Sequence, residues 1–296
     1  MGVLEDIILD IGKRTGISGV RKHMSDTFVE DAARFILLDN PKHAFIITGF
    51  FIPQPYQMDP LPETGATETD GPPGAYFLGK ALKKMGWRVT YVVDRYATFA
   101  FKGELGIADD DVVEFPITND EASERFAIDL LAGHKPSVQI AIERPGVTAD
   151  GRYLYVGGGD VTERTAKIDY LFKHHHATVG IGDWGNEMGL ANLAEHTRDA
   201  LPTKAPTVTE STYPIIAGVS NWGAYALVAA MSKLTRRNLL PHPDMEIEYI
   251  QRMVAQGMVE GGGRSECIID GFTLDENRKV LDALWDYLFS QGITSF

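Results

Sequence analysis

The chain has 296 residues and a formal net charge of −13, from 28 Lys and Arg against 41 Asp and Glu. Its 44% hydrophobic content is that of a globular protein, which excludes disordered, collagenous and coiled-coil classes. The acidic balance argues against nucleic acid or an anionic membrane as partner, because binding either one needs clustered Lys and Arg.

We find no targeting signal in the sequence, and we expect a cytoplasmic protein. Residues 1–16 carry acids among their apolar residues and lack the basic start and apolar core of a signal peptide. No stretch reaches about 18 apolar residues, so no spanning helix is expected. The single cysteine, Cys267, fits a reducing compartment. We expect a small-molecule substrate, an amino acid or another small anionic compound, and the sequence leaves a homo-oligomer open.

Short apolar runs rich in β-branched residues predict strands along the chain. They lie at 43–49, 88–94, 112–117, 138–143, 178–182, 213–219 and 266–270. Near-continuous apolar strands are typical of a sheet that is covered on both faces.

Helical patterns alternate with these runs. They lie at 74–85, 119–131, 162–173, 186–196, 222–236, 244–256 and 275–289, after an N-terminal helical pattern at 18–39. Trp222–Leu234 is apolar nearly all round and predicts a buried helix. The alternation predicts an α/β fold with a mostly parallel, doubly wound, Rossmann-like sheet and helices on both faces. We expect one domain over 1–296, with residues 1–40 as a helical segment packed on it.

Two loops, 51–73 and 147–159, are too long to be mere connections and are expected to be functional. In an open α/β sheet, ligands bind at the carboxyl ends of the strands. The residues that directly follow each predicted strand are therefore the ones to inspect for a site.

Acidic and glycine-rich segments follow most of the predicted strands. These are 68–71, 94–95, 143–146, 157–160, 180–187 and 270–271. Carboxylates that converge on one edge repel each other unless a cation lies among them. A hard divalent ion with oxygen ligands, Mg²⁺, Mn²⁺ or Ca²⁺, resolves the repulsion. The alternative is that some acids cap helices, as the capping-box spacing of Asp160 and Glu163 allows.

The segment at 180–187 is the most informative of these. Asp183 and Glu187 are four residues apart, so on a helix they share one face as two metal ligands or as a ligand and a proton-transfer group. The alternative is a pair of acids favoured by the dipole at a helix start. Asn186 is a candidate ligand or substrate contact. Gly180, Gly182 and Gly185 match the dinucleotide fingerprint, but the neighbouring acids and Trp184 oppose a pyrophosphate.

Three further features are ambiguous. Ser220 and Asn221 precede the apolar helix, as an N-cap that also attracts an anionic group. Arg144 either pairs with Glu143 or clamps a substrate carboxylate. The histidines at 174–176 lie at a predicted helix C-terminus, far from the strand ends, where cationic His is favourable without a metal.

Six segments in this order resemble the family of the C-terminal domain of D-glutamate cyclase. They are TGFFIP, ETDGPPGA, ERPG, GIGDWGNEMG, SNWGAYAL and IIDG, and the resemblance covers roughly residues 45–275. GIGDWGNEMG and SNWGAYAL are the specific ones. Trp184 stands where the family's pattern leads us to expect Gly, which would narrow the pocket.

The resemblance implies a lyase that converts D-glutamate to 5-oxo-D-proline and water with a divalent metal, Mn²⁺ first and Mg²⁺ second. It also implies an alternative, a Mn-dependent phosphatase that uses the same acidic site. We expect Glu143, Asp183 and Glu187 to hold the metal. Asp70, Glu143 and Asp183 are the expected catalytic residues, with Asp70 as ligand or base. The expected substrate-binding residues are Thr69, Arg144, Asn186, Ser220 and Asn221.

Overall fold

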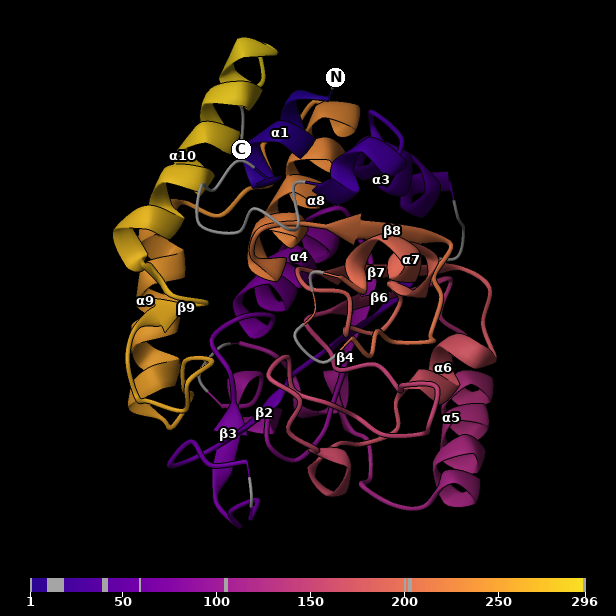
Figure 1. Cartoon of the computed structure of the whole chain (residues 1–296). Helices are drawn as coiled ribbons and strands as arrows, with labels where there is room; N and C mark the ends of the chain where they lie inside the picture. The colour runs from indigo at the N-terminus through magenta and orange to yellow at the C-terminus, as the bar shows by residue number, and fades with distance from the viewer. Residues whose placement is uncertain are drawn as a thin grey trace.

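The computed structural model describes residues 2–9, 19–38, 42–58, 60–103, 106–199, 201 and 204–294. Six strands of this part form the central sheet (Figure 1). They are β1 (His43–Thr48), β4 (Arg88–Val93), β5 (Val112–Glu114), β6 (Val138–Ile142), β7 (Thr178–Gly182) and β8 (Tyr213–Ile216). All neighbouring pairs are parallel, so the predicted α/β class is confirmed.

The order of the strands is β5-β4-β1-β6-β7-β8. The chain starts in the middle of the sheet, runs outward through β4 and β5, and then returns to the other side of β1 through β6, β7 and β8. The direction of winding therefore changes between β1 and β6. In doubly wound sheets, a crevice for ligands opens at the carboxyl ends of the strands at this point.

Successive residues of a strand face opposite sides of the sheet, and β1 shows this clearly. Ala44 and Ile46 belong to one apolar core, whereas Phe45 and Ile47 belong to another. Because all six residues of β1 are buried, the strand needs helices on both sides.

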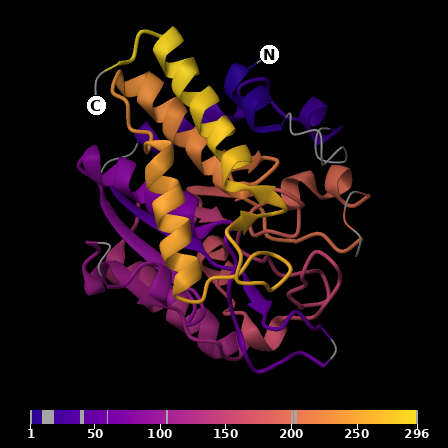
Figure 2. The ribbon, with the colours of Figure 1, turned by 90° about the vertical axis from the view of Figure 1, so that its left-hand side faces the viewer.

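The first face is covered by α4 (Pro72–Lys84), α8 (Ser220–Thr235) and α3 (Phe28–Leu38), with α1 (Val3–Leu9), α9 (Pro243–Ala255) and α10 (Leu274–Ser290) outside them. The first thirteen residues of α8 are buried, as its apolar sequence predicts. Figure 2 shows α9 and α10, in orange and yellow, running along the outside of this layer.

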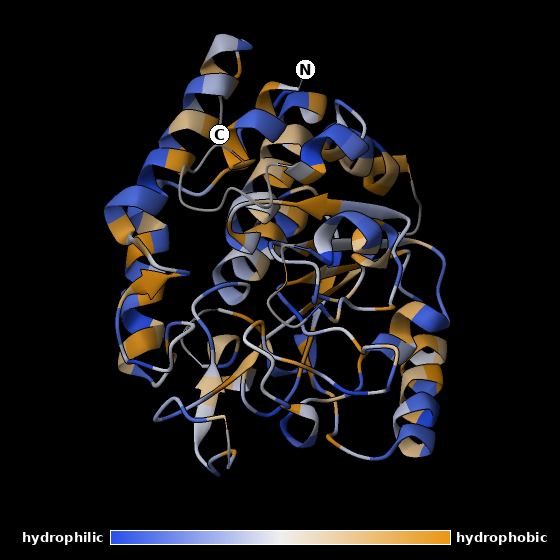
Figure 3. Cartoon of the chain, viewed as in Figure 1, coloured by the Kyte–Doolittle hydropathy of each residue, from blue (hydrophilic) through white to orange (hydrophobic). Residues whose placement is uncertain are grey.

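The second face is covered by α5 (Asp120–His134) and α6 (Asp169–Lys173). Both apolar and hydrophilic residues colour α5 along its length in Figure 3, as in a helix with one face on a core. No helix in the described part of the chain has the length and apolar character to cross a membrane.

Four predicted elements differ from the structure. Residues 186–196 do not form one helix: turns precede a 3-10 turn (Ala191–Leu193) and α7 (Ala194–Thr197), because Gly185 and Gly189 have φ of 101° and 97°. The expected 162–173 helix is split into a 3-10 turn (Thr162–Arg164) and α6. The 18–39 pattern is a 3-10 turn (Gly19–His23) followed by α3, and residues 18 and 39 lie outside the described part.

The fourth difference is the last predicted strand, which is not part of the sheet. Strand β9 (Ile268–Ile269) instead pairs antiparallel with β10 (Phe272–Thr273) in a small hairpin. The long loop after β1 also contains structure, since β2 (Phe51–Pro53) pairs with β3 (Gly65–Thr67).

Glu246 gives the fold a testable pH dependence. It is 1% exposed on α9, and burial raises its pKa from 4.5 to about 7. The folded protein therefore binds this proton more tightly than the unfolded chain, and its contribution to stability, about 3 kcal/mol, is lost as the pH rises from 4.5 towards 7. Glu246→Gln should remove that loss, measured by urea unfolding at about pH 5 and about pH 8. The exposed Glu248→Gln on the same helix is the control, and an unchanged pH dependence in Glu246→Gln would contradict this account.

Candidate active site

A pocket of about 240 Å³ lies at the carboxyl edge of the sheet, where the winding changes direction. Glu143 directly follows β6 and Asp183 directly follows β7, and both line it. The other acids that line it are Glu68, Glu260 and Asp270, and its aromatic residues are Phe50, Tyr155 and Trp184. The strand-end position thus brings acids from distant segments into one space.

A larger cavity of about 480 Å³ lies beside α6 and is not the acidic site. Its buried carboxylate, Asp169, accepts hydrogen bonds from the Tyr153 hydroxyl at 2.7 Å and the Val147 N–H at 3.1 Å. These bonds tie the loop at 147–153 to α6, which is a structural role.

The three expected metal ligands come together in the structure. Glu143, Asp183 and Glu187 each offer one carboxylate oxygen, and these oxygens lie within 4.8 Å of one another. All three side chains are buried, and Asp183 and Glu187 have no exposed surface. Three ionised carboxylates this close repel strongly in a buried site unless a proton or a cation separates them.

Glu187 reaches the group through a turn rather than a helix. Its carboxylate accepts hydrogen bonds from the Trp184 N–H at 3.0 Å and the Gly185 N–H at 2.7 Å. A Cβ at Gly182 would lie 2.5 Å from a Glu187 oxygen, so the folded-back carboxylate requires glycine there. The shared helical face expected from the four-residue spacing is therefore wrong. The glycine pattern also opens no helix whose N-terminus could bind a pyrophosphate.

Glu143 has both a strained backbone and a perturbed side chain. Its φ of 43° lies in the left-handed region, which is uncommon for a residue other than glycine. Burial raises the pKa of Glu143 well above 4.5, and the nearby charges of Glu187 and Glu68 raise it further. The Ser220 hydroxyl donates a hydrogen bond to Glu143 Oε2 at 2.5 Å. The Ser220 hydroxyl therefore holds the Glu143 carboxylate in place.

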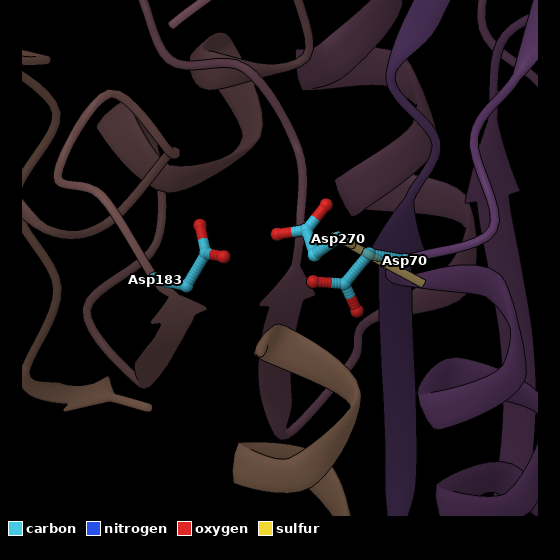
Figure 4. Close-up of side chains that lie close together, drawn as sticks. All are labelled: Asp70, Asp183 and Asp270. Carbon is cyan, nitrogen blue, oxygen red and sulfur yellow. The ribbon is translucent and has the colours of Figure 1, made fainter. Parts of the chain in front are cut away.

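A second acidic group shares Asp183 with the first. Asp70, Asp183 and Asp270 also offer oxygens within 4.8 Å of one another, and Figure 4 shows their carboxylates in one space. Asp270 and Gly271 form the two-residue turn between β9 and β10, with φ of 51° and 81°. Asp270 was not among the expected site residues, although the Asp-Gly pair at the end of a strand is a signal for this turn.

Asp70 joins the site to the start of α8. Its carboxylate accepts hydrogen bonds from the backbone N–H groups of Ser220 at 2.8 Å, Asn221 at 2.8 Å and Gly71 at 2.9 Å. The Asp70 carboxylate thereby satisfies the N–H groups of Ser220 and Asn221 in the first turn of α8 from outside that helix, as an N-cap would. A carboxylate that accepts three such bonds is held firmly in place.

Asn221 caps the other helix in return. Its Oδ1 accepts from the N–H groups of Gly71 at 3.0 Å and Gly74 at 2.8 Å, and its Nδ2 donates to the Thr69 carbonyl at 3.1 Å. Asn221 does not line the pocket. The expected substrate contact is therefore corrected: the amide fixes α4 against α8.

Thr69 has a similar positioning role. Its N–H donates to the Val259 carbonyl at 2.8 Å, and its hydroxyl donates to the Ile268 carbonyl at 2.6 Å. Because Ile268 is in β9, Thr69 fixes the hairpin that carries Asp270. Thr69 was expected to bind substrate; the structure places its side chain on this hairpin, outside the lining of the pocket.

Arg144 takes neither of its two expected roles. Its Nη1 donates to Asp94 at 2.6 Å and to the Gly49 carbonyl at 2.7 Å, and its Nη2 donates to the Ala166 carbonyl at 2.7 Å. The side chain is 1% exposed and does not line the pocket. It therefore pairs with Asp94 instead of Glu143 and holds no group in the site.

Asn186 does line the pocket, as expected. Its Nδ2 donates to the Leu154 carbonyl at 3.4 Å, whereas its buried Oδ1 has no hydrogen-bond partner among the described residues. Buried amide oxygens are normally satisfied, so this oxygen is available to bind a cation, a substrate group or water in the pocket. The histidines lie elsewhere. His174 Nε2 is 2.8 Å from Glu124 Oε1, and His175 Nε2 is 2.9 Å from the Pro136 carbonyl oxygen.

The reciprocal capping gives a stability prediction. Asn221→Ala should lower the free energy of unfolding by about 2 kcal/mol or more, because it leaves the Gly71 and Gly74 N–H groups buried without that acceptor. Asn186→Ala is the matched control, since it removes one 3.4 Å bond and should cost less. Urea unfolding measures both. Equal costs for the two variants would contradict the capping role.

Comparisons with known proteins show the family of this chain. Residues 4–285 match the model of a family described as D-glutamate cyclase-like, C-terminal. The mitochondrial D-glutamate cyclase of Homo sapiens is 31% identical over 214 residues, which are 66% of this chain and 33% of that protein. The chain thus spans about a third of that relative's length. The resemblance seen in the sequence is confirmed: the chain belongs to the D-glutamate cyclase-like C-terminal domain family.

Proposed function

We propose that the protein is a D-glutamate cyclase, a lyase that forms 5-oxo-D-proline from D-glutamate by intramolecular loss of water. The observation that carries the proposal is the buried group of Glu143, Asp183 and Glu187, with oxygens within 4.8 Å of one another. Membership of the D-glutamate cyclase-like family supports the choice of reaction.

The donor atoms fit a divalent metal, with Mn²⁺ as the preferred ion and Mg²⁺ as the alternative. Three carboxylates and the unpartnered Oδ1 of Asn186 are hard oxygen donors, which suit these ions rather than a thiolate-binding metal. When bound, such an ion would polarise the γ-carboxyl group of the substrate and stabilise negative charge on its oxygen.

The reaction moves two protons. The substrate nitrogen forms a bond to the γ-carboxyl carbon, a carbon–oxygen bond breaks, and that oxygen leaves as water with two protons given up by the ammonium group. Glu143 is our candidate for the transfer because it lines the pocket and its Oε2 accepts from the Ser220 hydroxyl at 2.5 Å. Asp70 is held by three N–H groups, so we assign it to positioning and metal binding rather than to proton transfer.

Substrate binding depends on the cation and the aromatic residues. No Lys, Arg or His is among the described residues that line the pocket. A bound metal would therefore be the cationic partner for the carboxylates of the substrate. The faces of Trp184, Tyr155 and Phe50 can attract the ammonium group by cation–π interaction.

A metal-dependent phosphohydrolase is the second candidate, and one observation favours it. The acidic group of Asp70, Asp183 and Asp270 shares Asp183 with the first group. Pairs of close metal ions are typical of phosphatases, in which they activate water and bind phosphate.

Mixing the purified protein with Mn²⁺ and D-glutamate tests the proposal. We expect 5-oxo-D-proline to form, and we expect Asp183→Asn to lower the rate at least ~100-fold, because it removes charge from the metal site. Asp129→Asn, an exposed acid on α5, should leave the rate unchanged. Chromatography of the product measures the rate.

A parallel assay with p-nitrophenyl phosphate separates the two candidates. Phosphate release without 5-oxo-D-proline would contradict the cyclase and support the phosphohydrolase. Full cyclase activity in Asp183→Asn would contradict the role of this residue.

A further inference from the structure

The site holds more negative charge than one divalent ion balances. Besides Glu260, which pairs with Arg264, six carboxylates line the pocket or belong to the two acidic groups: Glu68, Asp70, Glu143, Asp183, Glu187 and Asp270. If all six are ionised, one divalent ion offsets two of these charges and two ions offset four. Five of the six side chains are at most 5% exposed, so water screens them little.

The surrounding protein supplies little positive charge. The pocket has no basic residue among its described lining residues. Arg144 follows Glu143 in the chain, but its guanidinium pairs with Asp94 at 2.6 Å. Arg264 pairs with Glu260 at 2.9 Å. Compensation of the negative charge must therefore come from bound ions or protons, together with the N–H groups of α8 that donate hydrogen bonds to Asp70.

The carboxylates are arranged as two groups with one member in common. Asp183 belongs to both groups: one of its oxygens lies within 4.8 Å of oxygens of Glu143 and Glu187, and one within 4.8 Å of oxygens of Asp70 and Asp270. Figure 4 shows Asp70 and Asp270 beside each other across a space from Asp183. A carboxylate has two oxygens and about four acceptor positions, so Asp183 can serve one ion with each oxygen.

Asn186 is an independent sign of a ligand at this place. It is 4% exposed and lines the same pocket, and its Oδ1 has no hydrogen-bond partner among the described residues. An amide oxygen is a ligand for Mn²⁺ or Mg²⁺, so its position in the pocket supports a bound cation there.

We propose that the pocket binds a pair of divalent cations bridged by Asp183. One ion is held by Glu143 and Glu187 and the other by Asp70 and Asp270. The proposal rests on the metal-dependent function proposed above and deepens it, because the two ions give one partner to each carboxylate of the substrate in a pocket without basic side chains. The second ion depends on Asp270, which the β9–β10 turn brings to the site.

The experiment counts the ions and tests whether they are neighbours. The intact protein is dialysed to equilibrium against Mn²⁺, the bound metal is measured by mass spectrometry, and electron paramagnetic resonance detects magnetic coupling between ions. We expect two Mn²⁺ per wild-type chain with a spin-coupled spectrum. Asp270→Asn should bind one Mn²⁺ with an uncoupled spectrum. Asp275→Asn, an exposed acid five residues later, should behave as the wild type.

A wild-type protein that saturates with one Mn²⁺ would overturn the proposal, as would an Asp270→Asn variant that keeps a coupled pair. If Asp270→Asn does not fold by circular dichroism, the stoichiometry and coupling of the wild type decide the question. One ion together with formation of 5-oxo-D-proline refutes the pair and leaves the cyclase standing. A coupled pair without that product supports the pair and refutes the cyclase.

Discussion

Repulsion among buried carboxylates is the constraint on which the rest of this structure depends. Glu143, Asp183 and Glu187 come within ligand distance of one another with almost no contact with solvent. The protein itself offsets part of this repulsion. Backbone N–H groups bind Glu187 and Asp70, and the Ser220 hydroxyl binds Glu143. The remainder calls for protons or cations, and the proposed chemistry uses both.

The fold gathers these charges by bringing segments that are distant in sequence to the same edge of the sheet. The change of winding between β1 and β6 opens the carboxyl edge of the sheet. Asp70 and Asn221 then tie α4 and α8 to each other across that edge. Thr69 adds the β9–β10 hairpin, which brings Asp270 to a site that begins 200 residues earlier at Asp70.

What the sequence predicts well is what short-range patterns encode. Strand runs, the buried α8 and the acids directly after β6 and β7 follow from periodicity and from the rule about strand ends. The apolar pattern at 186–196 predicts a helix, but two glycines with positive φ turn the chain there. The sequence does not show the roles of Arg144 and Asn221, because their partners, Asp94 and Gly71, are distant in sequence. Asp270 was visible as a strand-end acid, but only the hairpin shows that it reaches the site.

The central claim is that these carboxylates are gathered around divalent cations. Its most direct test is a crystal soaked in Mn²⁺, with anomalous diffraction measured at the manganese absorption edge. The account predicts anomalous density in the pocket in contact with Asp183 and with carboxylates from the other segments. Density confined to other places, such as the histidines at 174–176, or no density in the pocket, would contradict it.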